Sequence, residues 1–137
     1  MKEPTYVITR KLGHRVYRDP RPKAEYYYCV RFGSRKVCEV WGDGHIRKFY
    51  DKSGKLTNDP AIGKNFGGIS GRVMVAAMLL RDAFDTNTAM NWCQDISDQL
   101  RMPSDLKSRM LDYSFVTYTK AELFALVLAA RQRMVTK

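Results

Sequence analysis

The sequence predicts an α+β fold: an N-terminal antiparallel β-meander of three to five strands, packed against three or four C-terminal helices. In the first half, apolar and polar residues alternate with period two between glycine-containing turns. After residue 71, apolar stretches of helical length follow one another. With 137 residues, we expect one domain with a basic β-rich part (1–60), a glycine-rich connector (61–71) and a helical part (72–137).

A three-stranded antiparallel meander is expected over about residues 25–50. Gly33-Ser34 is a pair typical of a two-residue hairpin turn, and Gly42-Asp43-Gly44 predicts a second tight turn. Upstream, residues 5–12 also alternate and predict a further strand. In the first strand of the meander, one set of side chains is expected in the core and the other at the surface: Tyr26, Tyr28, Val30 and Phe32 against Tyr27, Cys29 and Arg31.

The second half predicts a series of helices. Residues 72–84 are apolar on nearly every side, which predicts a buried central helix with Ser70 as its N-cap. Further helices are expected over about residues 88–101 and 104–112. Residues 113–118 are rich in β-formers and predict an extended segment or an added edge strand. The last helix begins with a capping box, Thr119-Lys120-Ala121-Glu122.

Positive charge is concentrated in the first half of the chain. The formal net charge is +10, and residues 1–60 hold 14 of the 24 lysines and arginines. A surplus of this size favours polyanions, because cationic side chains release counterions from them. We therefore predict a small, basic, non-enzymatic nucleic-acid-binding accessory protein. Its sheet and hairpin residues would contact phosphates, with Tyr27 as a stacking group: Arg31, Arg35, Lys36, Arg47 and Lys48.

The glycine-rich connector is a second candidate for phosphate binding. Glycines allow an anion to approach the backbone amides at the start of a helix. The candidate residues are Lys64, Gly67, Gly68 and Arg72. However, the stretch matches neither common glycine-rich nucleotide-binding motif, so the alternative is a plain connector with Ser70 as a helix cap.

Two other classes of function remain open. The lack of a catalytic signature also fits a phage- or plasmid-type inhibitor or adaptor, which would bind an acidic surface of a nucleic-acid-handling protein. Alternatively, His14 or His45 would act as a general base in a metal-independent phosphodiester-directed enzyme. A lone histidine is more often an ordinary surface residue, so no catalytic residue is assigned.

No cofactor or metal is predicted, because the three cysteines form no CxxC pair and the two histidines lack ligand spacing. The N-terminus has no apolar stretch of a secretory signal, and the longest apolar run, residues 73–80, is too short to cross a bilayer. We therefore expect a cytoplasmic protein without a membrane partner. The apolar C-terminal helix has more apolar surface than one contact needs, which favours a homodimer through it.

Overall fold

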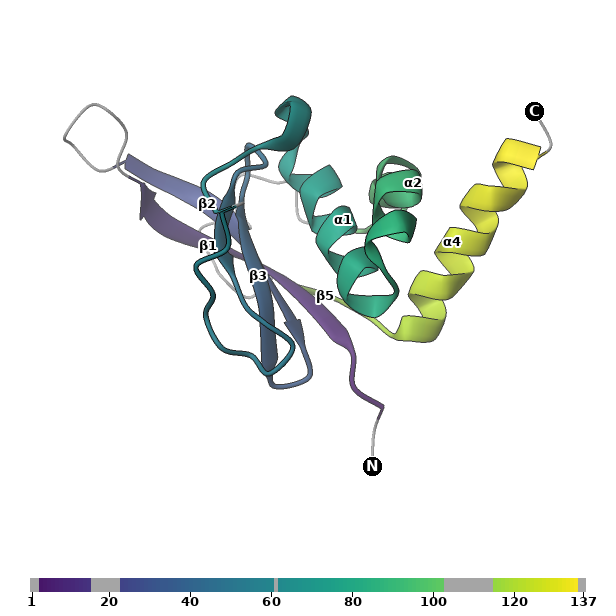
Figure 1. Cartoon of the computed structure of the whole chain (residues 1–137), viewed down its shortest axis with the longest axis horizontal. Helices are drawn as coiled ribbons and strands as arrows, with labels where there is room; N and C mark the ends of the chain where they lie inside the picture. Colours follow the sequence, from purple (N-terminus) through teal and green to yellow (C-terminus); the bar gives the residue numbers. More distant parts are fainter. Residues whose placement is uncertain (1–2, 16–22, 61, 103–114, 136–137) are drawn as a thin grey trace.

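The computed structural model consists of a five-stranded antiparallel sheet with helices on one side of it (Figure 1). It describes residues 3–15, 23–60, 62–102 and 115–135. The strands lie in the spatial order β4-β3-β2-β1-β5. This arrangement confirms the predicted α+β class and the N-terminal meander. The strand bounds are β1 (Tyr6–Arg15), β2 (Lys23–Phe32), β3 (Arg35–Trp41), β4 (Ile46–Phe49) and β5 (Phe115–Tyr118).

The longest pairing in the sheet is the hairpin of β1 and β2, which runs from Tyr6 opposite Phe32 to Arg15 opposite Lys23. β3 pairs only with residues 27–32 of β2, and β5 pairs only with residues 6–9 of β1. The far end of the hairpin, residues 13–15 and 23–25, therefore extends past its neighbours as a two-stranded ribbon (Figure 1). The predicted strand over residues 5–12 thus continues through Gly13, which has the ring of Tyr27 directly above it.

Three α-helices are described: α1 (Gly71–Ala83), α2 (Thr86–Ser97) and α4 (Lys120–Val135), preceded by a short 3-10 turn, η1 (Phe66–Gly68). Of these, α1 packs directly on β2 and β3, α2 packs on α1, and α4 packs on α2. The capping box of α4 is confirmed, because Thr119 and Glu122 each accept the other's backbone amide at 3.0 Å. The predicted helix over residues 104–112 lies outside the described residues.

The core lies between the sheet and α1. The side chains of Ile8, Val30 and Val40 are fully buried there and meet an α1 with almost no polar face, as the sequence predicted. A register shift between β2 and β3 places the adjacent residues Val37 and Cys38 both in this core. Tyr28 is buried, whereas Tyr26 and Phe32 are partly buried and pack against the core.

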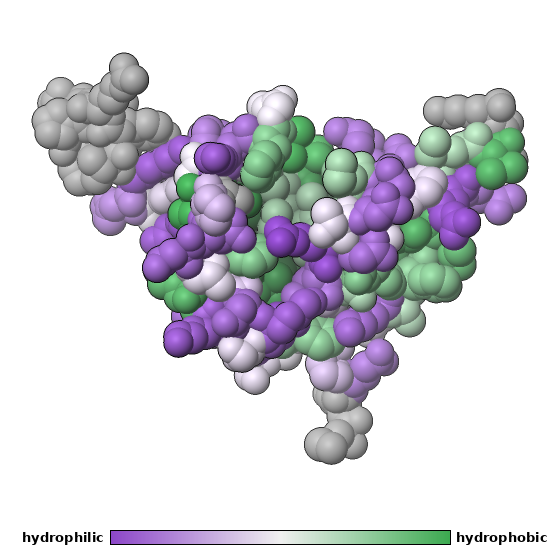
Figure 2. Space-filling model, viewed as in Figure 1, coloured by the Kyte–Doolittle hydropathy of each residue, from purple (hydrophilic) through white to green (hydrophobic). Residues whose placement is uncertain are grey.

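The helix α4 is the outermost element and is buried along a narrow stripe only. Leu123, Val127 and Ala130 face the rest of the protein. Apolar side chains on its other sides remain exposed, and Figure 2 shows apolar surface along this helix. The exposed set is Phe124, Leu128, Met134 and Val135.

The turn between β3 and β4 requires glycine at position 44. Gly44 has a φ of +96°, and a Cβ there would collide with the carbonyl oxygen of Ile69 in the connector. Asn65 fastens the same contact, since its Nδ2 donates to the carbonyls of Asp43 at 2.7 Å and Ile69 at 3.0 Å. The turn and the connector are therefore packed backbone to backbone.

We expect Gly44→Ala to lower the free energy of unfolding by about 3 kcal/mol, since a left-handed backbone strain and a backbone collision add together. The matched control is Gly67→Ala, because Gly67 has a φ of +74° but open space where the Cβ would lie. This control should lose only about 1 kcal/mol. Urea unfolding of both variants measures the difference, and equal losses would contradict the packing described.

Candidate nucleic-acid interface

The described helices lie on one face of the sheet, with α1 in contact with β2 and β3, and none of them covers the other face (Figure 1). Residues directly opposite in an antiparallel pair point to the same face, and neighbours along a strand point to opposite faces. Because Ile8, Val30 and Cys38 point into the core, the residues between them point away from the helices. We call this side the open face, and its charged and aromatic residues on β1 to β4 are Lys11, Arg15, Glu25, Tyr27, Arg31, Lys36, Glu39, Trp41, Arg47 and Lys48.

Most of the predicted phosphate contacts lie on the open face. Arg31 and Lys36 are exposed and stand opposite each other on β2 and β3. Lys48 stands opposite Glu39, and Arg47 forms an ion pair with Glu39. The structure therefore places Arg31, Lys36, Arg47, Lys48 and Tyr27 on the same face of the sheet.

Two guanidinium groups cover the aromatic rings of the open face. The rings of Tyr27 and Trp41 meet edge to face, with centroids 5.7 Å apart. The guanidinium of Arg47 lies 4.4 Å above the Tyr27 ring, and that of Arg15 lies 5.0 Å above the Trp41 ring. Trp41 is consequently only 8 % exposed. The ring face of Tyr27 that was predicted to stack on a base is occupied by an arginine.

Carboxylates hold these two arginines in place. Arg15 donates to Asp43 at 2.8 Å and lies 3.3 Å from Glu25, while Arg47 pairs with Glu39. Ion pairs of this kind contribute little net stability where they are exposed, but they restrict the directions in which the guanidinium groups can donate. The remaining N–H groups are thereby oriented before any ligand arrives.

Arg35 does not join this surface. It forms two hydrogen bonds with the carboxylate of Asp82 on α1, at 3.1 and 2.7 Å. Tyr6 donates to the same carboxylate at 2.5 Å, and Lys52 lies 3.2 Å from it. Arg35 therefore fastens the β2–β3 hairpin to the helical layer, a use that its position beside a hairpin turn does not reveal.

Hydrogen bonds keep Asp82 ionised. Its side chain is 9 % exposed, and burial alone would raise its pKa, but the bonds from Arg35, Tyr6 and Lys52 outweigh burial and lower the pKa below its usual value. Burial, followed by the bond to Asp82, raises the pKa of Tyr6, so its hydroxyl keeps the proton that it donates. This cluster therefore links the sheet to α1.

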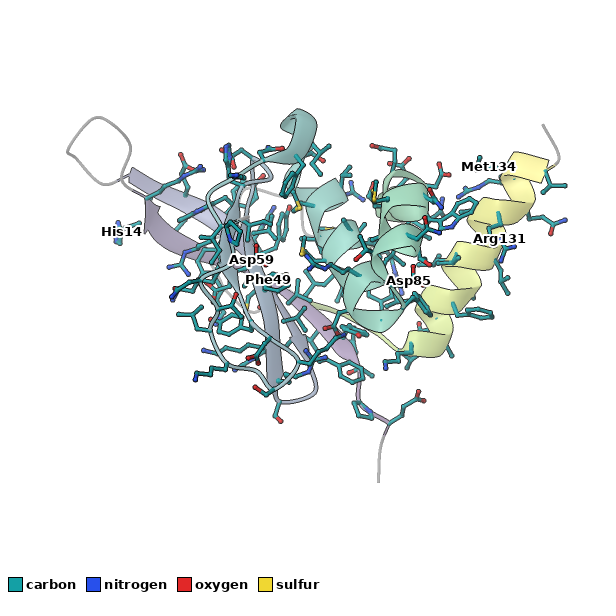
Figure 3. All side chains as sticks on the ribbon, in the orientation of Figure 1. His14, Phe49, Asp59, Asp85, Arg131 and Met134 are labelled. Atoms are coloured by element: carbon teal, nitrogen blue, oxygen red, sulfur yellow. The ribbon has the colours of Figure 1, made fainter. Side chains whose placement is uncertain are left out.

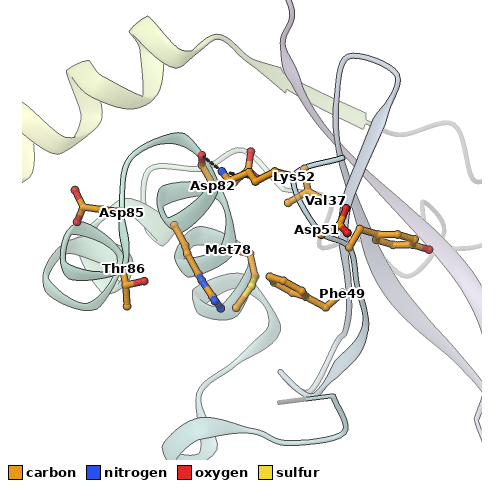
Figure 4. Close-up of a pocket in the computed structure, with 10 residues that line it drawn as sticks. Val37, Phe49, Asp51, Lys52, Met78, Asp82, Asp85 and Thr86 are labelled. Carbon is orange, nitrogen blue, oxygen red and sulfur yellow. Dashed lines mark hydrogen bonds and ion pairs between the residues drawn. The ribbon is translucent and has the colours of Figure 1, made fainter. Parts of the chain in front are cut away.

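A cavity of about 420 Å³ lies beside this cluster (Figure 4). Its apolar wall is made by Val37, Phe49 and Met78, and its rim carries Lys52 and Arg81. Lys52 already donates to Asp82, and Arg81 lies 5.1 Å above the ring of Phe49. No histidine or cysteine is found among the described residues that line the cavity, so we assign it no chemistry.

The connector does not gather its predicted phosphate ligands. Arg72 turns away from it and donates to the carbonyls of Ser97 and Leu100 at the end of α2, at 3.1 and 2.8 Å. Ser70 caps α1 by accepting the amide of Val73, as predicted. Gly67 and Gly68 are exposed with positive φ, and the Lys64 side chain is also exposed. Lys64 and Arg72 are both exposed, but the guanidinium of Arg72 is directed to the end of α2.

The two histidines have different surroundings. His45 follows the β3–β4 turn, and its Nδ1 lies 2.8 Å from the carboxylate of Asp43, which also binds Arg15. Burial would raise the pKa of Asp43, but its bonds with His45 and Arg15 lower it overall. His14 lies on the two-stranded ribbon opposite Ala24, at the end of the sheet (Figure 3).

The sequence-based site omitted Lys11, Arg15 and Trp41. Lys11 stands opposite Tyr27 on β2, which in turn stands opposite Trp41 on β3. Alternation along β2 predicts that the Tyr27 side chain points away from the core. The register of β1 and β3 is needed to place Lys11, Arg15 and Trp41 beside it. The register between β1 and β2 depends on the full length of their hairpin, which local alternation does not give.

Comparisons with protein-family models, with curated proteins and with solved structures found no match to this chain. Within the described ranges, no group of three or more His, Cys, Asp and Glu side chains is placed to hold a metal ion. None of the helices described is both long and apolar enough to cross a bilayer.

We expect Asp82→Asn to lower the free energy of unfolding by about 2 kcal/mol at neutral pH, because charge-assisted hydrogen bonds from Arg35 and Lys52 are lost. A carboxylate with a lowered pKa stabilises the fold above its unfolded value of about 3.9, and this contribution disappears as the pH falls through the native pKa. The gap between wild type and variant should therefore shrink below about pH 4. Urea unfolding across this pH range measures the difference in unfolding free energy. A difference that stays constant would contradict an ionised Asp82 in the folded protein.

Proposed function

We propose that this protein binds nucleic acid through the open face of its sheet, as an accessory protein that performs no catalysis. The observation that carries the proposal is the gathering of cations on the one sheet face that the described helices leave uncovered: Lys11, Arg15, Arg31, Lys36, Arg47 and Lys48. Cations arranged on a firm sheet suit the phosphate backbone, which carries the sequence-independent part of nucleic-acid affinity.

Of the six cations on this face, Arg31 and Lys36 at the β2–β3 hairpin end are exposed, and the other four are partly buried. Glu39 and Glu25 balance part of the charge of Arg47 and Arg15. Among the described residues, no carboxylate forms an ion pair with Arg31 or Lys36. These two side chains are therefore expected to supply the largest share of counterion release.

Removing that pair tests the proposal. We expect Arg31→Ala/Lys36→Ala to weaken DNA binding about tenfold or more at about 100 mM salt and to reduce the slope of log K against log salt by about two. The matched control is Arg131→Ala/Arg133→Ala, which removes the same charge from α4, on the other side of the protein from the ribbon (Figure 3). Fluorescence anisotropy over a salt series gives both quantities. The proposal fails if the two double variants bind equally, or if wild type shows no binding near 50 mM salt.

One observation favours a second candidate, metal-independent cleavage of a phosphodiester. The carboxylate of Asp43 orients the imidazole of His45 through Nδ1, which is how a base is held for proton transfer at the other ring nitrogen. On RNA, Nε2 would take the proton of a 2′-hydroxyl while its oxygen attacks the adjacent phosphorus. The bond from phosphorus to the 5′-oxygen breaks, and water protonates the leaving oxygen. Arg15, bound to the same Asp43, would stabilise the added negative charge.

The two candidates give opposite results on labelled RNA incubated with a metal chelator. The leading proposal predicts that the RNA stays intact. The second candidate predicts cleavage that persists without metal and is lost in His45→Ala but kept in His14→Ala, because among the described residues a carboxylate partner is found for His45 and none for His14. Gel electrophoresis of the products decides between them.

The protein-binding alternatives remain predictions. An inhibitor or adaptor, or a homodimer through the last helix, would find an apolar surface at Phe124 and Leu128 of α4. A pull-down with and without nuclease separates a protein partner from one bridged by nucleic acid.

A further inference from the structure

We infer that the ligand of the open face is double-helical DNA, held by both phosphate backbones along one groove, and that single strands are poor ligands. The inference rests on the proposed function and names its substrate class. It is drawn from the cover over the aromatic rings and from the spacing of the cations.

The covered rings argue against a single strand. Proteins that hold single-stranded nucleic acid depend on aromatic faces, on which successive bases stack. Here Arg47 lies over Tyr27, and both Arg15 and Arg47 lie over Trp41, at 5.0 and 5.3 Å. Below the Tyr27 ring lies Gly13, close enough that even a Cβ there would be 2.9 Å from a ring carbon. A base could stack on these rings only after an arginine had left its ion pair and its aromatic contact.

The cations form two clusters with little net charge between them. The hairpin-end cluster consists of Arg31 and Lys36, and the ribbon-end cluster of Lys11, Arg15 and Arg47. Between them runs the row of Thr9, Cys29, Glu39 and Lys48, in which Cys29 and Glu39 are buried and the charges of Glu39 and Lys48 are opposite.

The spacing of the clusters matches a groove. Arg31 and Tyr27 mark the two ends and are four residues apart on β2, which is about 13 Å along a strand. The major groove of B-form DNA is about 12 Å wide, so one cluster can meet each of the two backbones that border it. A single strand has one backbone and would leave one cluster without a phosphate.

The same spacing distinguishes DNA from RNA. The major groove of A-form RNA is deep and narrow, whereas clusters about 13 Å apart match the width of the major groove of B-form DNA. The geometry therefore favours a DNA duplex over an RNA duplex.

The test compares a DNA duplex of about 20 base pairs with each of its single strands and with the RNA duplex of the same sequence, at about 100 mM salt. Anisotropy should show the DNA duplex bound about tenfold more tightly than either single strand, and more tightly than the RNA duplex. Lys11→Ala and Arg31→Ala/Lys36→Ala should each weaken duplex binding, because each removes cations for a different backbone. Equal or tighter binding of a single strand or of the RNA duplex overturns the inference while leaving the proposed function intact. No binding of any probe rejects both.

Trp41 provides a second readout that does not depend on affinity. In Trp92→Phe, emission at long excitation wavelength comes from Trp41, since the chain has two tryptophans. Because Arg15 and Arg47 cover the ring, its emission should stay nearly unchanged when DNA saturates the protein. Strong quenching would mean that a base stacks on Trp41, and the inference would be wrong.

Discussion

A part-buried carboxylate on α1 determines how the two layers of this protein meet. Asp82 joins Tyr6 at the start of β1, Arg35 at the β2–β3 hairpin and Lys52 after β4, and so binds three separate parts of the sheet to one helix. Removing a partner of this carboxylate costs stability, because its charge then stays largely shielded from water with fewer hydrogen bonds. The helices are thereby fixed on one face, and on the other face Arg31 and Lys36 are exposed.

The open face is ordered by its own carboxylates. Glu39 holds Arg47, and Asp43 holds both Arg15 and His45. The cost of ordering these long side chains is met during folding and does not recur on binding. The same carboxylates neutralise part of the positive charge of Arg15 and Arg47. The surface therefore combines arginines held by carboxylates near the ribbon with Arg31 and Lys36 at the β2–β3 hairpin, which form no ion pair within the described part of the chain.

Local patterns predicted most of the fold. The hairpin turn at Gly33-Ser34, the cap at Ser70, the capping box at Thr119 and the buried α1 each depend on residues close together in the chain. The site was predicted less completely, because its contacts are long-range. Asp82 lies 47 residues from Arg35, and the end of α2 lies 25 to 28 residues from Arg72. No periodicity encodes such partners, and the register shifts in β3 and β4 also decide which face each cation takes.

The strand β5 has a consequence for how the chain folds during synthesis. It pairs with β1 from Tyr6 opposite Tyr118 to Thr9 opposite Phe115, although more than 100 residues separate them. At a translation rate of about 5 to 20 residues per second, the outer edge of β1 waits about 5 to 20 seconds for its partner. During that interval the edge can accept a strand from a neighbouring nascent chain. The edge of β1 is therefore open to mispairing until β5 has been synthesised.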